Sequence, residues 1–474
     1  MGALPHRARV RRLPRTLVIT VLVGLCAAAC TTGGRDGPAG SPSASADRQS
    51  VGQRLASQSL RLAEKDARLS VALALEAAGL AHTPDVAAAL SRLRSPHPVS
   101  QLKREGAPVR AMSFSGEGRF LLAGDAGGQV RVWDVYSGRT RLTGRVRGAV
   151  TEAALSYGGD LAAARGARGG LTVWNVRTGK TVRTFADAPG GAQGLTFVPA
   201  EQERLAFGGR GGTVEVRDVR SWNRETTIRP AGGSAALTWF LDGGKEGTVL
   251  SSLSTRGTLE AWSLDGGRRL GAARVPGPGA AAGPYVLDSR TDDHGVLSLS
   301  STTWTVSLRT LLDSDRSGSV FRRLPRDISR PVTLTSRLMG TDPAGGSVLL
   351  WEMEDPLPHR RFSPGAEIAL PTRPGRITAL TGYDQPTGMV GQGAPTKRLP
   401  VAVGTEDGSV TFWDLAEGPE VGETEKAVKE ELFQLCSGTP LILTPAEWRK
   451  LIPELPYAPA CVRTMKERGT AGHD

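Results

Sequence analysis

One six-residue phrase, Q-V-R-V-W-D at residues 129–134, recurs along the chain and constrains the fold more than any other feature. Side chains alternate between the two faces of a strand, so Val130 and Val132 share one face while Arg131 and Trp133 share the other. Related phrases follow at L-T-V-W-N (171–175), V-E-V-R-D (214–218), L-E-A-W-S (259–263), V-L-L-W-E (348–352) and V-T-F-W-D (410–414). The recurrence indicates a chain built from repeated strands separated by turns.

The spacing of these phrases sets the size of the repeat. The intervals are 41, 43, 45, 89 and 62 residues between Trp133, Trp174, Arg217, Trp262, Trp351 and Trp413. The interval of 89 residues fits two units, and we interpret Val306–Arg309 as the disguised strand between them. The interval of 62 residues fits one unit with an insertion around residues 383–399. Seven units of similar length are therefore expected.

This period, with a W-D-like dipeptide closing a strand, resembles the WD40 repeat, whose four strands form one blade of a β-propeller. The resemblance implies a mainly β fold, with a seven-bladed WD40-like β-propeller over residues 98–418. The residues that carry the repeat signature are Trp133, Asp134, Trp174, Asn175, Asp218, Trp262, Trp351, Asp407, Trp413 and Asp414.

The signature is incomplete in two respects. The Gly-His pair that opens a WD40 repeat is absent. The turn aspartate expected six residues before the Trp occurs only as Asp407, and Gly127, Arg168 or Arg256 holds that place elsewhere. The blades should then depend chiefly on apolar packing and strand hydrogen bonds. We also expect residues 99–104 to pair with residues 410–415, because such pairing closes the ring and removes an open sheet edge.

The first thirty residues have the pattern of an export signal. Five arginines precede the apolar run 16–29, which ends at C-A-A-A-C (26–30). As a helix, residues 16–30 would span about 22 Å, less than the roughly 30 Å of a bilayer core. The stretch Ala27–Cys30 resembles a bacterial lipobox, although that motif prefers Leu where Ala27 stands. The resemblance implies a lipid on Cys30 and a protein on the outer face of the cell membrane; a secreted protein and a retained anchor are the alternatives.

Two helical segments should flank the repeats. Residues 31–48 are rich in Gly, Ser, Pro and Ala and are expected to form a flexible linker. Residues 49–95 have apolar residues at helical spacing, and T-P-D at 83–85 begins the last of two or three helices. These helices should pack on the propeller or on each other; a partner-binding arm is the alternative. Residues 419–467 form a second helical segment, with a capping box at Thr444–Glu447.

Both flanking segments resemble parts of actinobacterial signalling NTPases, namely the helical linker before their WD40 array and the Cys-containing tail after it. No NTPase module or phosphate-binding loop motif occurs in this chain. Cys26 and Cys30 belong to the export signal, so a mature exported chain would keep Cys436 and Cys461. In an oxidising compartment these two should form a disulfide.

Few residues suggest chemistry. The six histidines are scattered, and the arginine-dense stretches 322–330 and 359–361 are interpreted as a solvated rim. No catalytic, cofactor-binding or metal-binding residue is predicted, and much of the net charge of +12 lies in the export signal, so nucleic acid is not an expected partner. We expect a monomeric protein-interaction scaffold with an unidentified protein partner. The alternatives are a propeller enzyme, a hydrolase or dehydrogenase acting in the central channel, and a cell-envelope assembly factor.

Overall fold

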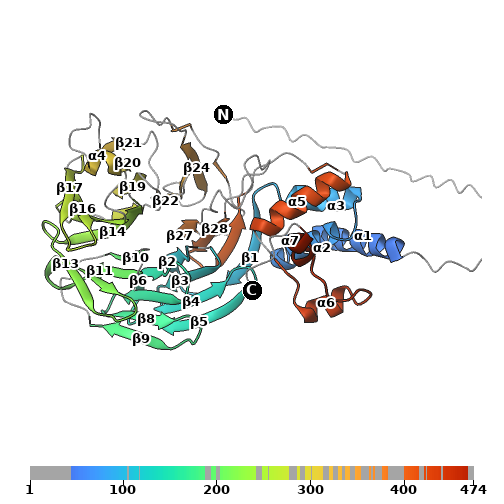
Figure 1. Ribbon diagram of the computed structural model, residues 1–474, viewed down its shortest axis with the longest axis horizontal. Coiled ribbons are helices and arrows are strands. Elements are labelled where there is room, and N and C mark those ends of the chain that lie inside the picture. The colour runs from blue at the N-terminus through green and yellow to red at the C-terminus, as the bar shows by residue number, and fades with distance from the viewer. Residues whose placement is uncertain are drawn as a thin grey trace, which may run out of the picture. The chain divides into compact units, whose positions relative to one another are not determined.

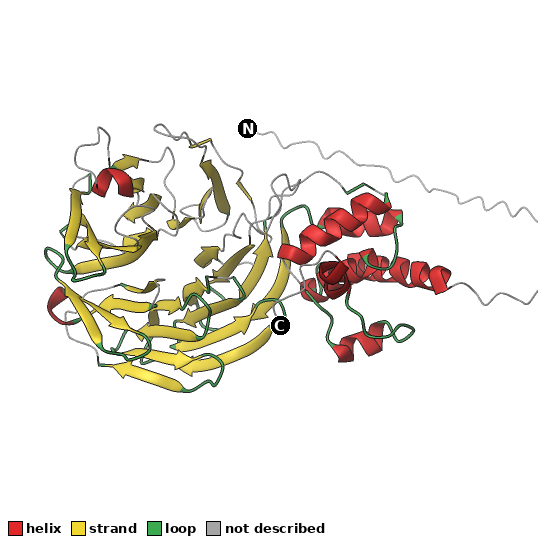
Figure 2. Ribbon diagram, viewed as in Figure 1, coloured by secondary structure: helices red, strands yellow, loops and turns green. Residues whose placement is uncertain are grey.

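The described strands of the computed structural model form antiparallel sheets, and its helices gather beside them (Figures 1 and 2). The structure describes residues 44–103, 106–116, 118–186, 194–198, 203–241, 248–254, 256–276, 285–288, 294–299, 302–312, 320–323, 329–333, 337–341, 347–353, 362–363, 367–368, 376–382, 400–415, 421–422, 424–438 and 441–467. The export signal with Cys30, and the linker as far as residue 43, lie outside these ranges. Residues 44–474 belong to one compact unit.

We number the sheets 1 to 7 in chain order, and sheets 1 to 4 have four strands each. In order across each sheet, sheet 1 is β2 (Val109–Phe114), β3 (Phe120–Asp125), β4 (Gln129–Asp134) and β5 (Arg139–Arg145); sheet 2 is β6 (Val150–Leu155), β7 (Leu161–Gly166), β8 (Leu171–Asn175) and β9 (Thr181–Phe185); sheet 3 is β10 (Leu195–Val198), β11 (Arg204–Gly208), β12 (Val214–Asp218) and β13 (Arg224–Ile228); sheet 4 is β14 (Ser234–Leu241), β15 (Thr248–Ser254), β16 (Thr258–Ser263) and β17 (Arg269–Arg274).

The remaining sheets follow the same order. Sheet 5 is β18 (Tyr285–Asp288), β19 (His294–Leu299), β20 (Thr302–Ser307) and β21 (Phe321–Arg323). Sheet 6 is β22 (Ser329–Thr333), β23 (Arg337–Thr341), β24 (Val348–Met353) and β25 (Phe362–Ser363), and β26 (Glu367–Ile368) also pairs with β24. Sheet 7 is β27 (Ile377–Gly382), β28 (Pro400–Thr405), β29 (Val410–Asp414) and β1 (His97–Lys103). The prediction of a mainly β fold made of four-stranded antiparallel sheets is confirmed.

Neighbouring sheets meet through their first strands. Strand β2 contacts β6, β6 contacts β10, β10 contacts β14, β14 contacts β18, β18 contacts β22, β22 contacts β27, and β27 contacts β2. The series therefore runs from sheet 1 to sheet 7 and returns to sheet 1. Each sheet can bury apolar side chains against both neighbours in this arrangement.

Sheet 7 joins the two ends of the repeat region. Strand β1 pairs antiparallel with β29, from His97 opposite Asp414 to Lys103 opposite Val410, which confirms the pairing predicted for this segment. The Lys103 Nζ also lies 3.0 Å from Oδ2 of Asp125 at the end of β3 in sheet 1. The start of the repeat region is thus fixed to both its last sheet and its first.

The repeated tryptophan holds one sheet against the previous one. Trp174 of sheet 2 is buried, and a Cβ placed on Gly144 of sheet 1 would come within 2.9 Å of its indole ring. Trp262 of sheet 4 is in a buried cluster with Val214 and Val216 of sheet 3. In sheet 5, Val306 stands at the position of the repeated tryptophan and is fully buried against sheet 4. The prediction that the strand continues through Leu308 and Arg309 is wrong, because these two residues begin helix α4 (Leu308–Leu312).

Six helices, which we call the helical module, pack together beside sheet 7. They are α1 (Ala44–Leu62), α2 (Ala67–Ala78), α3 (Pro84–Arg92), α5 (Glu425–Gly438), α6 (Pro445–Leu451) and α7 (Ala460–Glu467). Helix α1 begins at Ala44, five residues earlier than predicted, because the alanines and Asp47 that open it favour a first helical turn. One buried cluster contains residues of these helices together with Val99, Val410 and Phe412 of sheet 7. The helices therefore pack on each other and on the sheet.

Covalent and polar contacts join the two halves of the helical module. Cys436 of α5 and Cys461 of α7 form a disulfide with an S–S distance of 1.99 Å and a Cα–Cα distance of 5.1 Å. Arg94 forms a buried ion pair with Glu431, so the segment before the sheets is held directly to the segment after them. The capping box predicted at Thr444–Glu447 is present at the start of α6 and is confirmed.

Candidate interaction site

The signature residues do not converge on one site, because each serves its own sheet. Trp133, Trp174, Trp262 and Trp413 are buried, and Trp351 is in β24 with a side chain outside the described residues. Asp134 accepts a hydrogen bond from the Ser137 amide at 3.1 Å, Asn175 from the Thr178 amide at 2.8 Å, and Asp218 from the Ser221 amide at 2.6 Å. These side chains cap the turn that follows the third strand, so their role is structural.

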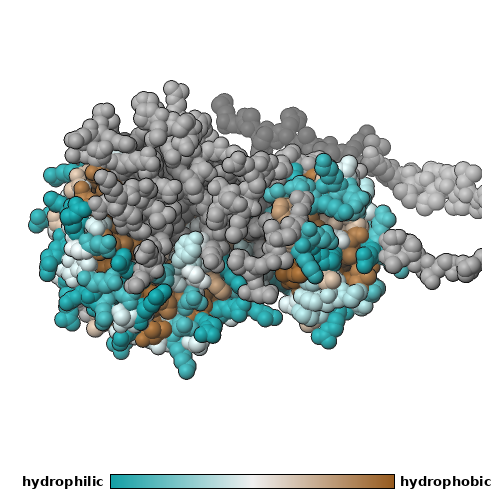
Figure 3. Space-filling model, in the orientation of Figure 1, coloured by the Kyte–Doolittle hydropathy of each residue, from teal (hydrophilic) through white to brown (hydrophobic). Residues whose placement is uncertain are grey.

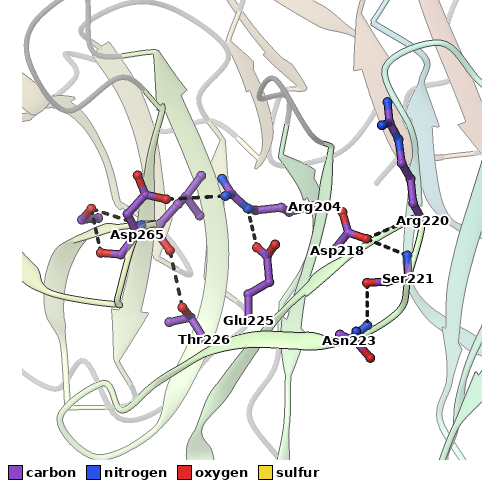
Figure 4. A network of polar contacts seen from close by, with 10 residues as sticks. Arg204, Asp218, Arg220, Ser221, Asn223, Glu225, Thr226 and Asp265 are labelled. Atoms are coloured by element: carbon purple, nitrogen blue, oxygen red, sulfur yellow. Dashed lines mark hydrogen bonds and ion pairs between the residues drawn. The ribbon is translucent and has the colours of Figure 1, made fainter.

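The turns at this end of sheets 1 to 4, which we call the opposite turns, comprise residues 115–119, 135–138, 156–160, 176–180, 199–203, 219–223, 242–247 and 264–268. Ionic groups at the strand ends beside these turns pair with one another, as Figure 4 shows for Arg204 of β11, which lies 2.6 Å from Glu225 of β13 and 3.5 Å from Asp265 of the next sheet. Asp134 likewise binds Arg141 at 2.9 Å. Burial alone would raise the pKa of Asp134, but the Arg141 and Ser137 hydrogen bonds and the Arg119 charge together lower it.

The loops at the other end of the same sheets have a different composition. Strands alternate in direction, so the loops 146–149, 167–170, 209–213, 229–233 and 255–257 all lie at the end away from the opposite turns. Each of these five loops contains one arginine and none contains Asp or Glu. We call this surface the arginine face; its arginines are Arg147, Arg168, Arg210, Arg229 and Arg256.

Direct contacts join neighbouring loops of this surface. The Arg168 amide donates to the Arg147 carbonyl at 3.0 Å, and a Cβ placed on Gly212 would lie 2.7 Å from the Gly233 Cα. Both Gly212 and Gly233 also have a positive φ, so glycine is needed there for two reasons. The aliphatic stem of Arg256 lies over Gly232, since a Cβ added to that glycine would be 2.7 Å from the Arg256 Cγ. The printed contacts therefore join the loops in two groups, one with Arg147 and Arg168 and the other with Arg210, Arg229 and Arg256.

The guanidinium groups of the arginine face have no polar partner among the residues that the structure describes. All five arginines are exposed. None makes an ion pair or a side-chain hydrogen bond with another residue in the part of the chain that the structure describes. Over sheets 1 to 4 the loops at this end carry six basic residues and two acids, Glu105 and Asp187, both outside the described residues, whereas the opposite turns carry six basic and seven acidic residues. Such a one-sided field attracts anionic groups.

A cavity of about 260 Å³ lies between sheets 2 and 3 where they meet the arginine face. Its apolar wall comprises Leu171, Phe185 and Phe207, and the two phenyl rings are 4.9 Å apart. Arg165, Arg210, Glu215 and Arg217 also line it. Because Gly209 and Arg210 belong both to the cavity lining and to loop 209–213, the cavity is continuous with the arginine face.

Arg217, which lines the cavity, stands where most of the repeats have tryptophan. Arg217 is opposite Leu205, just as Trp262 is opposite Leu250 in the next sheet. Its guanidinium binds Glu215 at 2.7 Å and the Trp222 carbonyl at 2.9 Å, and it lies 5.0 Å from the centre of the Phe185 ring. An arginine drawn aside in this way fills less of the space between sheets than an indole does. Trp222, with a φ of 61°, folds back to within 6.2 Å of Phe185 and closes part of the gap.

Sequence reasoning missed a turn residue and the arginine face. Asp125, eight residues before Trp133, accepts from the Gly127 and Gln129 amides at 2.9 Å each, so an aspartate does support this turn, although not at the expected position. An Asp followed two residues later by glycine was the available signal. The arginine-dense stretches that did attract attention are placed elsewhere: Arg322 and Arg323 are in β21, and residues 359–361 lie outside the described part of the chain.

On the face drawn in Figure 3, hydrophilic residues predominate over the described sheets, and apolar residues form small separate patches. Among the described residues no group of three or more His, Cys, Asp and Glu is placed to hold a metal ion, and no helix combines the length and apolarity needed to span a bilayer. The chemistry available at this surface is charge, hydrogen bonding and one small apolar cavity.

One segment of the chain matches a known family model. Residues 97–134, which run from β1 through β4, match the family model described as WD domain, G-beta repeat. The match spans the outer strand of sheet 7 and the first three strands of sheet 1, so one sequence repeat bridges two sheets. Residues 97–134 are therefore similar to one WD40 repeat.

One curated relative gives a distant similarity. The chain is 26% identical over 247 residues to Protein TOPLESS-RELATED PROTEIN 2 of Oryza sativa subsp. japonica. The similarity covers 51% of this chain and only 21% of the relative. What that much longer protein does as a whole therefore does not transfer to this chain.

Proposed function

We propose that this protein is an extracytoplasmic, lipid-anchored scaffold whose seven sheets form the blades of a closed WD40-like propeller. The series of first-strand contacts that returns from sheet 7 to sheet 1 supports seven blades, as does the pairing of β1 with β29. The anchor is supported by the export signal of residues 1–30 and by the lipobox-like Ala27–Cys30. The protein is expected to be a monomer, which light scattering of the purified chain will test.

The observation that carries the scaffold proposal is the arginine face. Charges inside a folded protein are usually paired, whereas exposed charges of one sign that remain uncompensated repel one another and favour association with an opposite charge. The arginine face brings five such groups together on loops held by direct contacts. A partner with a negatively charged surface would bind there with a fast association rate.

Capture from intact cells tests the scaffold. The full chain is crosslinked on the cell surface and purified, and the captured proteins are identified by mass spectrometry. A triple variant, Arg168→Glu with Arg210→Glu and Arg256→Glu, should lose the specific partner. A matched variant at the opposite turns, Arg177→Glu with Lys180→Glu, changes two exposed basic residues and should keep it. Equal capture by both variants would contradict a role for the arginine face.

The anchor is tested separately with Cys30→Ser. Metabolic labelling with a clickable fatty acid should mark the unaltered protein and leave the Cys30→Ser protein unmarked. The variant should also move from the membrane fraction to the medium or stay as an uncleaved precursor. A labelled Cys30→Ser protein, or an unlabelled natural one that is still cleaved, would leave a plain secretory cut as the correct interpretation.

A further inference from the structure

The cavity between sheets 2 and 3 gives the arginine face a second recognition element. At about 260 Å³ it is smaller than the roughly 300–1,000 Å³ typical of small-molecule sites, and it suits a single large side chain. Leu171, Phe185 and Phe207 offer an apolar wall, and the tilted phenyl pair leaves aromatic surface for an entering ring. Anchor side chains in such pockets commonly dominate the affinity of protein interfaces.

The charges around the cavity restrict what can enter. Arg217 is neutralised by Glu215, and Arg165 lies 2.9 Å from Glu152 while also donating to the Gly208 carbonyl at 2.9 Å. Arg210 lines the cavity and makes no side-chain contact with another described residue. An apolar anchor would therefore be flanked by one uncompensated cation at the cavity and by the other arginines of the face on both sides.

We infer that the arginine face binds an acidic segment of a partner protein, and that this segment inserts one aromatic or large aliphatic side chain into the cavity that Arg217 leaves open. The inference rests on the proposed scaffold function and specifies its partner. Acidic residues before and after the anchor would meet Arg147 and Arg168 on one side and Arg229 and Arg256 on the other. A nucleic acid would also satisfy the arginines and could stack a base on the phenyl rings, so its competition with an acidic peptide is one outcome of the test below.

Peptide binding to the purified full chain tests this inference. The probe is a fluorescein-labelled peptide of alternating Glu and Ser with one central Phe. A second peptide has Ala in place of Phe, and a third has Gln in place of every Glu. Fluorescence anisotropy should give the Phe peptide an affinity at least about tenfold higher than the Ala peptide, since burying a phenyl ring contributes that much or more. The Gln peptide should bind most weakly, and added salt should weaken both acidic peptides.

Two variants separate the cavity from the charges. Arg217→Trp introduces the residue found in most of the other repeats and should fill the cavity, so the Phe and Ala peptides should then bind equally. Thr184→Trp alters an exposed residue of β9 that also lines the cavity, and it should give the same result without touching the core. The triple arginine reversal should weaken both peptides at least tenfold, and the Arg177→Glu, Lys180→Glu control should weaken neither.

Three results would overturn the inference, and each points to a different error in it. Equal affinity of the Phe and Ala peptides for the unaltered chain would exclude an anchor in the cavity. Displacement of the Phe peptide by single-stranded DNA at the same charge concentration, with DNA affinity also reduced by Arg217→Trp, would assign the site to nucleic acid. If no peptide binds although a partner is still captured from cells through the arginine face, the scaffold stands and the acidic, anchored segment does not.

Discussion

Arginine occurs in two contrasting settings in this molecule. In the helical module Arg94 is almost completely buried and is paired with Glu431, whose side chain has no exposed surface. On the arginine face, Arg147 and Arg168 belong to loops joined by a backbone hydrogen bond and have no acidic neighbour in either loop. The buried Arg94–Glu431 pair joins two distant parts of the chain, whereas the arginines of the arginine face remain available to another molecule. The same side chain therefore stabilises the fold in one region and is available for binding in the other.

The comparison teaches that net charge says little about where binding occurs. The opposite turns of sheets 1 to 4 contain more basic residues than the arginine face does, yet acids accompany them, and Arg119 pairs with Asp134 at the end of β4. What distinguishes the arginine face is the lack of acids in its five described loops. The contrast predicts large effects on stability in the helical module and small ones on the arginine face.

The largest expected loss follows from breaking the buried pair. Glu431→Ala leaves the Arg94 guanidinium buried without its carboxylate, and it should lower the free energy of unfolding by about 3–5 kcal/mol. Urea unfolding of the full chain measures the loss. Glu454→Ala is the matched control, because Glu454 pairs with Arg54 at 2.9 Å while both side chains are about half exposed, and it should cost at most about 1 kcal/mol. Equal losses for the two variants would contradict the contrast.

Removing the disulfide should have the next largest effect. The bond between Cys436 and Cys461 closes a loop with a sequence separation of 25 residues, and its loss should cost about 3.5 kcal/mol by the chain-entropy estimate. The double variant Cys436→Ser with Cys461→Ser should show this loss in thermal or urea unfolding. A reducing agent should destabilise the natural protein and leave the double variant unchanged. Indifference of the natural protein to reduction would show that the bond contributes little.

Glu76 should make the helical module sensitive to pH. Burial raises the pKa of Glu76 to about 7, although the Ala460 amide at 2.9 Å and the charge of Arg463 act in the opposite direction. A raised carboxyl pKa means that folding favours the neutral form. The stability that comes from the neutral carboxyl group is therefore fully present below pH 4.5, the pKa of the unfolded state, and is lost as the pH rises through about 7. The loss at full ionisation should be about 3 kcal/mol.

Urea unfolding of the full chain at about pH 5 and about pH 8 measures this loss, since the two values lie on either side of most of the titration. Glu76→Gln keeps an acceptor for the Ala460 amide and removes the charge, so its stability should vary less between the two pH values. A variant with the same pH dependence as the natural protein would show that another group is responsible.

The smallest effect on stability is expected at the arginine face. Reversing Arg168, Arg210 and Arg256 to Glu should change the free energy of unfolding by no more than about 0.5 kcal/mol each, because these side chains have no described partner to lose. Asp218→Ala at the opposite turns should cost about 1 kcal/mol, since it removes the acceptor for the Arg220 and Ser221 amides. A larger loss from the arginine variants than from Asp218→Ala would reverse the comparison.

Much of the fold could be predicted from the sequence because its signals are local and repeated. The spacing of Trp133, Trp174 and Trp262 marks strands at a fixed position in successive sheets, and Thr444 with Glu447 marks a helix start. The closing pair of β1 and β29 was predictable because an unpaired strand before the first repeat needs a partner at the end of the last.

The arginine face and its cavity could not be predicted in the same way. Arg168 and Arg256 were visible as replacements of a turn aspartate, but only the alternation of strand direction brings them to one surface with Arg147, Arg210 and Arg229. Likewise, the sequence shows that Arg217 replaces a tryptophan, but the neighbouring sheet decides whether the space is filled. Trp222 fills part of it from a turn with a positive φ, which no local pattern indicates. Long-range packing therefore determines the candidate site.

The pairing of β1 with β29 has a consequence for how the protein must be made. His97 lies opposite Asp414, so the earliest strand of the repeat region finds its neighbour only after almost every other residue of that region has been synthesised. Contacts between such distant parts of a chain form slowly, and until they form β1 has an exposed edge. A polypeptide that stops before residue 410 would keep that edge open permanently. Synthesis of β29 thus determines whether the edge of β1 is paired or stays exposed and prone to aggregation.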